Sequence, residues 1–202
     1  MNQKIFGKIF LASNSPRRNL LLSEAGFDVE VIKGRNIKEK YPSTLPVHDI
    51  PSFLSRIKAS AYSDVSYTEH IPLVAADTLV ILDGIPLGKP ADQEECILTL
   101  QKLSNKWHSV VTGVTLLLPD TPIRTFDVET KVKFSQLSDT MINYYVDNFK
   151  PFDKAGAYGI QEWIGMVGVE KIEGDFYNIM GFPVNRFITE YLSLFPLHSE
   201  KG

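Results

Sequence analysis

An apolar segment at residues 72–82 is interrupted by a single carboxylate, Asp77. A run of this length, rich in Val, Leu and Ile, predicts a strand buried in a sheet. Burying an ionised carboxylate without a partner is very costly, so Asp77 should hold a cation, pair with a base, or face a cleft. The alternative is a structural Asp that accepts backbone hydrogen bonds. A functional role is favoured, because perturbed carboxylates gather at functional sites.

Strands and helices are mixed along the rest of the chain. Further strands are predicted at 8–12, 28–33, 85–87, 109–118 and 123–134, and helices at 16–25, 50–64, 92–103, 139–148 and 184–194. Residues 34–46 form a polar segment. Residues 156–181 hold six of the 13 glycines and are expected to be built from turns. This mixture favours an α/β fold with a curved mixed sheet and flanking helices.

Length and composition narrow the class of protein. The 202 residues predict a single domain over residues 1–202, with room for two small lobes around a shared cleft. A net charge of −3 gives no broad basic surface for nucleic acid. The lone Cys96 rules out an internal disulfide and suits a reducing compartment. No window reaches the roughly 18 apolar residues of a membrane span, so a cytoplasmic protein without membrane contact is expected.

The segment Ser13-Asn14-Ser15-Pro16-Arg17-Arg18 places two arginines in the first turn of a predicted helix. Positive charge there opposes the helix dipole, which favours anions at this end. A bound phosphate would offset the mismatch, since helix N–H groups, the hydroxyls of Ser13 and Ser15 and a guanidinium all donate to anion oxygens. Equally compatible with the pattern is a helix capped by Ser15, with solvated arginines.

Two further segments carry weaker signals. Lys89 stands in the turn Leu87-Gly88-Lys89-Pro90, and a solvated surface lysine is the favoured interpretation of that pattern alone. In the segment 156–161 the amide of Gln161 could read a pyrimidine edge with one donor and one acceptor. A tight structural loop, with Tyr158 and Tyr177 packed beneath it, is favoured there instead. Phosphate-loop, dinucleotide and zinc motifs are absent from the sequence.

Five segments together resemble the Maf family of nucleoside triphosphate pyrophosphatases. They are S-x-S-P-R-R at 13–18, A-A-D-T at 75–78, L-G-K-P at 87–90, G-A-Y-G-I-Q at 156–161 and E-G-D-x-Y-N-x-x-G-x-P at 173–183. The resemblance implies hydrolysis of a nucleoside triphosphate to the monophosphate and pyrophosphate, with Mg²⁺ or Mn²⁺. It also implies a fold like that of the inosine triphosphatases, with two lobes flanking a nucleotide cleft, and often a homodimer.

The same resemblance implies roles for individual residues. Asp77 matches the catalytic acid, as a proton acceptor or as a metal ligand, and Glu39 matches a metal-linked glutamate. Substrate-binding residues would be Ser13, Ser15, Arg17, Arg18, Lys58, Thr78, Lys89 and Gln161.

Two positions indicate the base. Thr78 and Gln161 look like the subgroup that hydrolyses dTTP and UTP, with modified pyrimidine nucleotides as further candidates. Relatives that prefer 7-methyl-GTP tend to differ at both positions. Glu162-Trp163 departs from the small residue that many members carry after the Gln, which would place a bulky aromatic beside the base pocket. Two alternatives stay open: a non-catalytic nucleotide-binding regulator of cell division, and a pyrophosphatase that prefers 7-methyl-GTP.

Overall fold

The computed structural model describes residues 4–32, 35–65, 71–118 and 121–195. Its strands are β1 (Lys8–Leu11), β2 (Asp28–Val31), β3 (Leu73–Leu82), β4 (Ile85–Leu87), β5 (Trp107–Leu117), β6 (Arg124–Phe134) and β7 (Val169–Glu173). Its helices are α1 (Pro16–Glu24), η1 (Val47–Asp49), α2 (Ile50–Ser60), α4 (Gln93–Leu103), α5 (Asp139–Phe149), η2 (Ala155–Ala157), α6 (Trp163–Gly168), α7 (Phe176–Ile179) and α8 (Val184–Leu194).

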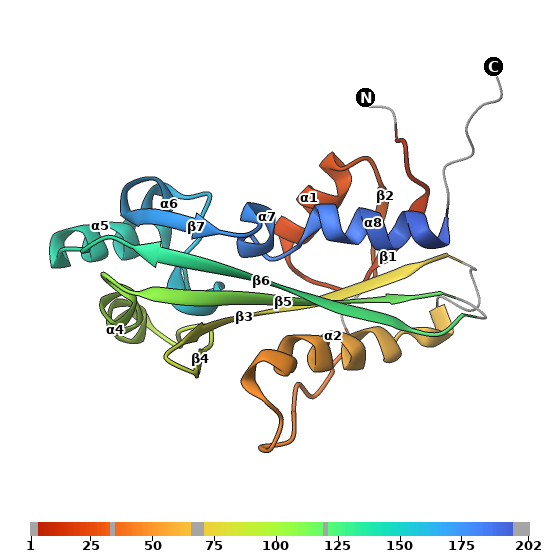
Figure 1. Ribbon diagram of the computed structural model, residues 1–202, viewed down its shortest axis with the longest axis horizontal. Helices are drawn as coiled ribbons and strands as arrows, with labels where there is room; N and C mark the ends of the chain where they lie inside the picture. The colour runs from red at the N-terminus through yellow and green to blue at the C-terminus, as the bar shows by residue number, and fades with distance from the viewer. Residues whose placement is uncertain (1–3, 33–34, 66–70, 119–120, 196–202) are drawn as a thin grey trace.

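The strands form one mixed sheet in the order β2-β1-β3-β5-β6-β7, with β4 paired to β3 (Figure 1). β1 runs parallel to both β2 and β3, and the other pairings are antiparallel. This confirms the predicted α/β fold with a mixed sheet and the predicted hairpin of β5 and β6. The turn expected at 119–120 lies outside the described residues.

The two faces of the sheet are covered by different helices. α2 lies on one face, while α1 and α8 lie on the other (Figure 1). Side chains alternate between the faces along a strand. Ala75 of β3 therefore packs with Ala59 of α2, whereas Val74 packs with Phe187 of α8.

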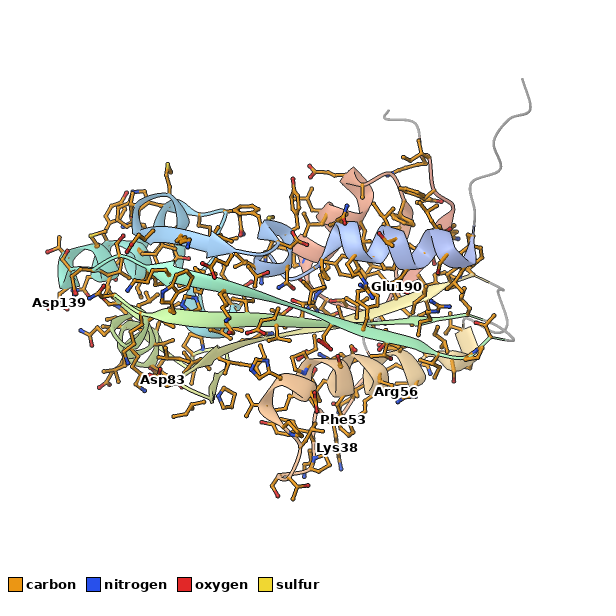
Figure 2. The ribbon with its side chains drawn as sticks, viewed as in Figure 1. Lys38, Phe53, Arg56, Asp83, Asp139 and Glu190 are labelled. Atoms are coloured by element: carbon orange, nitrogen blue, oxygen red, sulfur yellow. The ribbon has the colours of Figure 1, made fainter. Side chains whose placement is uncertain are left out.

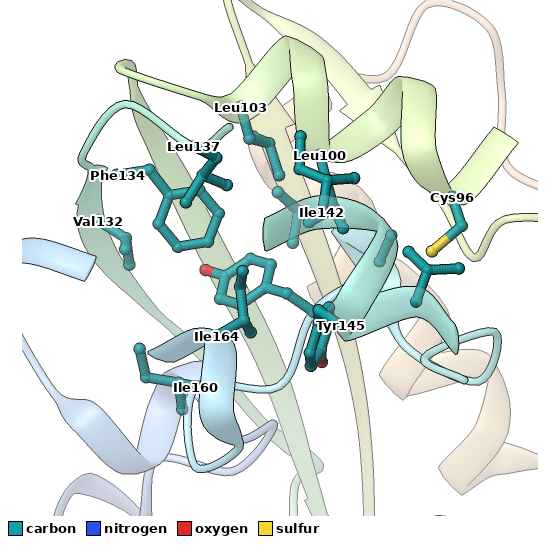
Figure 3. Packing of buried hydrophobic residues seen from close by; sticks show 14 of the residues in the cluster. Cys96, Leu100, Leu103, Val132, Phe134, Leu137, Ile142, Tyr145, Ile160 and Ile164 are labelled. Atoms are coloured by element: carbon teal, nitrogen blue, oxygen red, sulfur yellow. The ribbon is translucent and has the colours of Figure 1, made fainter. Parts of the chain in front are cut away.

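Two apolar clusters sit at opposite ends of the long strands. Cys96, Leu100, Phe134 and Tyr145 belong to the cluster under α4 and α5, which also contains Val80 of β3 (Figure 3). The second cluster joins α1, α8 and the other end of β3. Asp77 and Thr78 fall between Ala76 of one cluster and Val80 of the other. The two expected lobes therefore correspond to these two clusters at the two ends of one sheet, while a third cluster, which contains Ala59 and Ala75, lies between α2 and β3.

The glycine-rich stretch contains more regular structure than the sequence indicated. Residues 156–181 were expected to be turns, but they include α6, β7 and α7. The prediction was wrong because three of these glycines stand at the ends of short elements: Gly168 ends α6, and Gly174 and Gly181 follow β7 and α7 with positive φ. The helix predicted at 50–64 is also interrupted, since α2 ends at Ser60 and a turn precedes helical residues at 63–65.

None of the helices in the described residues is both long enough and apolar enough to cross a bilayer.

Candidate active site

A cleft of about 800 Å³ opens at one edge of β3. β1 pairs with β3 as far as Val74, and β4 pairs with it from Val80 onward. Residues 76–80 between these pairings line the cleft. The cleft is therefore a consequence of the topology: two strands share one edge of β3 and leave its middle open.

All ten residues that the sequence analysis selected line this one cleft. They are Ser13, Ser15, Arg17, Arg18, Glu39, Lys58, Asp77, Thr78, Lys89 and Gln161. They come from the β1–α1 loop, the first turn of α1, the segment before η1, α2, β3, and the segments after β4 and η2. The structure thus brings together residues as much as 148 positions apart in the sequence.

Asp77 meets a lysine from the facing helix. The Oδ1 atom of Asp77 accepts a hydrogen bond from Nζ of Lys58 at 2.5 Å, and Oε1 of Glu39 lies 3.0 Å from the same Nζ. The Asp77 and Lys58 side chains are only 16% and 14% exposed. This pairing explains how a carboxylate is tolerated in an apolar strand, and it agrees with the expectation that Asp77 pairs with a base.

The closeness of α2 to the sheet depends on Gly113 of β5, which stands opposite Asp77 in the strand register. A Cβ atom at Gly113 would lie 2.2 Å from the backbone nitrogen of Ser52 in α2. Glycine inside a strand often marks such a close backbone approach. Gly113 therefore allows α2 to bring Lys58 onto Asp77.

The two arginines at the start of α1 both have protein partners, Asp153 for Arg17 and three acceptors for Arg18. Arg18 donates from Nε to the carbonyl of Gly181 at 2.9 Å, and from its terminal nitrogens to Ser13 Oγ at 3.2 Å and Thr78 Oγ1 at 2.9 Å. Burial of the guanidinium lowers the pKa of Arg18 from its ordinary value, partly offset by the nearby Asp77. Ser15 occupies the N-cap but its hydroxyl makes no capping hydrogen bond. The alternative of a capped helix with solvated arginines is therefore wrong.

A chain of alternating charges, which the sequence analysis missed, forms another wall. Asp153 accepts a hydrogen bond from Arg17 at 2.7 Å and one from Lys154 at 2.8 Å. Lys154 is only 8% exposed, lines the cleft, and also pairs with Glu162 at 3.0 Å. Partial burial raises the pKa of Asp153, but hydrogen bonds from Lys154 and Arg17 outweigh it and bring the value to about 2. Asp153 and Lys154 stand directly before the segment 156–161, and this position was the signal in the sequence that could have identified them.

The structure confirms some of the other predictions for the cleft and the residues around it, and corrects others. Lys89 is exposed but lines the cleft, and Thr78 Oγ1 lies 3.0 Å from Thr112 Oγ1 of β5. Tyr158 is buried as expected, whereas Tyr177 is 50% exposed. Trp163 does not line the cleft: its ring packs against Tyr144 of α5, with centroids 4.8 Å apart. Trp163, the bulky aromatic that was expected beside the base pocket, is therefore not part of the cleft lining.

Asp77 and Glu39 are the carboxylates that could hold a divalent cation. Both contact the same ammonium group, so they lie close together, and carboxylate oxygens suit Mg²⁺ or Mn²⁺. Among the described residues no group of three or more Asp, Glu, His or Cys could hold a metal ion. Mg²⁺ commonly binds through one or two carboxylates together with substrate phosphates. The pair therefore fits an ion held jointly with a phosphorylated substrate, rather than by protein atoms alone.

The charge of the cleft is opposite in sign to that of the whole protein. Its lining contains six basic residues (Arg17, Arg18, Arg35, Lys58, Lys89 and Lys154) and three acidic ones (Glu39, Asp77 and Asp153). Its volume lies within the range of small-molecule sites. Fold and site together define an α/β protein whose basic cleft, with an acid on its floor, is built for a phosphorylated small molecule.

Comparison with known proteins places the chain within a family. A family model described as Maf-like protein matches residues 8–193, and the chain belongs to the Maf family. A protein of Cytophaga hutchinsonii, named dTTP/UTP pyrophosphatase, is 48% identical over 187 residues, which cover 93% of this chain and 84% of that protein. A protein of Phocaeicola vulgatus with the same name is 46% identical over 93% of this chain and 96% of its own length.

A solved structure supports the fold. The HAM1 protein of Coxiella burnetii superimposes with a TM-score of 0.51 at 14% identity, covering 93% of this chain and all of that one. At this identity the likeness concerns the fold alone, and it agrees with the predicted inosine triphosphatase-like architecture.

Proposed function

We propose that the protein hydrolyses nucleoside triphosphates to the monophosphate and pyrophosphate, with dTTP and UTP as preferred substrates and modified pyrimidine nucleotides as further ones. The observation that carries this proposal is the position of Asp77: a carboxylate on the floor of a basic cleft, 2.5 Å from Lys58. The names of the relatives from Cytophaga hutchinsonii and Phocaeicola vulgatus support the choice of substrate.

The reaction requires a water molecule to attack the α-phosphorus while pyrophosphate leaves. Asp77 has two alternative roles in this step: it takes the proton from that water as general base, or it would hold the cation that activates the water. Negative charge that builds up on the phosphate oxygens is stabilised by Lys58, Lys89 and Arg17. Arg18 already gives three of its five N–H donors to protein acceptors, so its main role is to hold the loop at 13–18 against Thr78 and Gly181.

Asp77 and Glu39 would hold a divalent cation when the nucleotide binds. A divalent cation supplies charge neutralisation on the phosphates and activation of a bound water. Lys58, which contacts both carboxylates, would then be free to turn toward a phosphate oxygen.

A nucleotide panel tests the proposal directly. The purified protein with Mg²⁺ is incubated with dTTP, UTP, CTP, GTP, ATP and 7-methyl-GTP, and the products are resolved by ion-exchange chromatography. We expect pyrophosphate and the monophosphate, formed fastest from dTTP and UTP. Release of orthophosphate, or the absence of turnover, would contradict the reaction. Fastest turnover of 7-methyl-GTP would contradict the substrate choice, and binding without turnover would favour the regulatory alternative.

A homodimer and a cytoplasmic location are part of the same proposal. The family resemblance implies the homodimer, and the lone Cys96, which suits a reducing compartment, supports the location. Sedimentation of the purified protein and fractionation of the source cell would test them.

A further inference from the structure

The wall of the cleft that carries Gln161 is tied to the wall that carries Arg17 by four charged groups of alternating sign. Arg17 pairs with Asp153, Asp153 with Lys154, and Lys154 with Glu162. The four charges sum to zero, and the Lys154 and Glu162 side chains at the inner end are 10% and 20% exposed. A buried lysine between two carboxylates has its charge balanced locally, so removal of one partner would leave an uncompensated charge.

Tyr145 closes the inner end of this chain. Its hydroxyl donates a hydrogen bond to Oε2 of Glu162 and accepts one from the backbone N–H of Gly159 at 3.0 Å. Burial, and then the hydrogen bond to Glu162, raise the pKa of Tyr145 above its ordinary value, so the hydroxyl keeps its proton. Figure 3 shows Tyr145 within the same apolar cluster as Ile160 and Ile164.

The turn that bears Gln161 is consequently fixed at both ends. The Glu162 N–H donates to the carbonyl of Gly159 at 3.0 Å, and a Cβ atom at Gly159 would lie 2.8 Å from the Glu162 carboxylate carbon. Ile160 between them is buried, with 5% exposure. Gln161 itself is exposed and lines the cleft. A rigid turn thus presents one polar side chain to the ligand.

We propose that Lys154, Glu162 and Tyr145 are positioning residues that set the base specificity of the cleft by fixing the turn that carries Gln161. This inference rests on the proposed function and names what makes that site selective. Uracil and thymine present an acceptor and a donor where cytosine presents a donor and an acceptor. A fixed turn holds the Gln161 side chain at one distance and angle from the base, whereas a loose turn lets the amide approach either base equally well.

Lys154, Glu162 and Tyr145 together form a clamp that fixes the turn. The test changes Glu162 and Tyr145 separately. Glu162→Gln keeps the size of the side chain but leaves Lys154 short of one negative charge, and Tyr145→Phe removes only the bridging hydroxyl. We expect each variant to lower the ratio of kcat/KM for UTP to that for CTP about tenfold, through KM. The kcat for UTP and the inhibition by tripolyphosphate, which has no base, should stay within about threefold of wild type.

Matched variants from the other end of the molecule serve as controls. Glu190 of α8 is 15% exposed and pairs with two arginines, and Tyr191 is buried in the other apolar cluster (Figure 2 labels Glu190). Glu190→Gln and Tyr191→Phe should lower thermal stability while leaving the UTP to CTP ratio unchanged. The inference is overturned if both clamp variants keep the wild-type ratio, or if the controls lower it equally. Should Glu162→Gln not fold, Tyr145→Phe, which changes no charge, decides.

Failure of the proposed function would be visible separately. A wild-type protein that does not turn over UTP contradicts that function, and calorimetric binding of UMP and CMP to the same proteins then tests the clamp. A wild-type preference for UMP that both clamp variants lose supports the inference. A preference that they keep, or equal binding of UMP and CMP by the wild type, overturns it.

Discussion

At the scale of single residues, the proposed chemistry depends on the carboxylate of Asp77. Asp77→Asn keeps a hydrogen-bond acceptor for Lys58 but removes the charge and the ability to take a proton. We expect kcat to fall by about 10²–10⁴-fold, the typical contribution of general acid–base catalysis, while UMP still binds. A coupled pyrophosphate assay and calorimetry measure the two quantities. A variant with a near-normal rate would remove Asp77 from the mechanism.

Short motifs made the residues of the cleft predictable. The pairings between residues of distant segments could not be predicted. Asp77 was recognisable because a carboxylate in an apolar strand demands a partner. Lys58 entered only through the family resemblance, as a substrate-binding residue, and its pairing with Asp77 was not predicted, since nothing in the sequence of α2 distinguishes it. Asp153 and Lys154 were missed because the bond between Asp153 and Arg17 joins positions 136 residues apart.

Gly113 shows how the contact between two elements determines the site. A methyl group at this position would meet the backbone of α2, which cannot rotate out of the way as a side chain can. We expect Gly113→Ala to lower the free energy of unfolding by about 3 kcal/mol or more, at the upper end of overpacking effects. Urea unfolding measures this, with Gly88→Ala, which has open space around it, as the control. Equal stability of the two variants would contradict the close packing of α2.

Elements with a clear hydrophobic period were predictable from sequence, and the short elements of the glycine-rich stretch were not. β3, β5 and β6 were expected to within three residues of their observed ends, because long apolar or alternating runs have few other solutions. α6, β7 and α7 have six, five and four residues, too few to show a period. Their existence depends on packing against α5 and β6 rather than on local preference.

At the scale of the whole molecule, the cleft lies between the apolar clusters at the two ends of the long strands. Residues packed in these clusters support the walls of the cleft. His108 of β5 lies in the wall beneath Tyr158: its Nε2 is 2.7 Å from the Tyr158 hydroxyl, and its ring also packs against Phe134. Within the described residues its Nδ1 has no hydrogen-bond partner. An imidazole so enclosed is stable only in its neutral form.

This burial makes stability depend on pH, because it lowers the pKa of His108 to about 4 from an ordinary value of 6.5. Between these values the unfolded chain binds a proton that the folded chain does not, so stability falls as the pH drops through this window. The group should remove about 2 kcal/mol of unfolding free energy between pH 7 and pH 5. Urea unfolding at both values measures the loss, and His108→Gln should abolish it while His48→Gln, at an exposed position, should not. The lowered pKa of Asp153 affects stability only below this pH window, because this carboxyl has an ordinary pKa of 3.8 and a pKa of about 2 in the folded protein. An identical pH dependence in wild type and His108→Gln would therefore show that the wall of the cleft tolerates a charged imidazole.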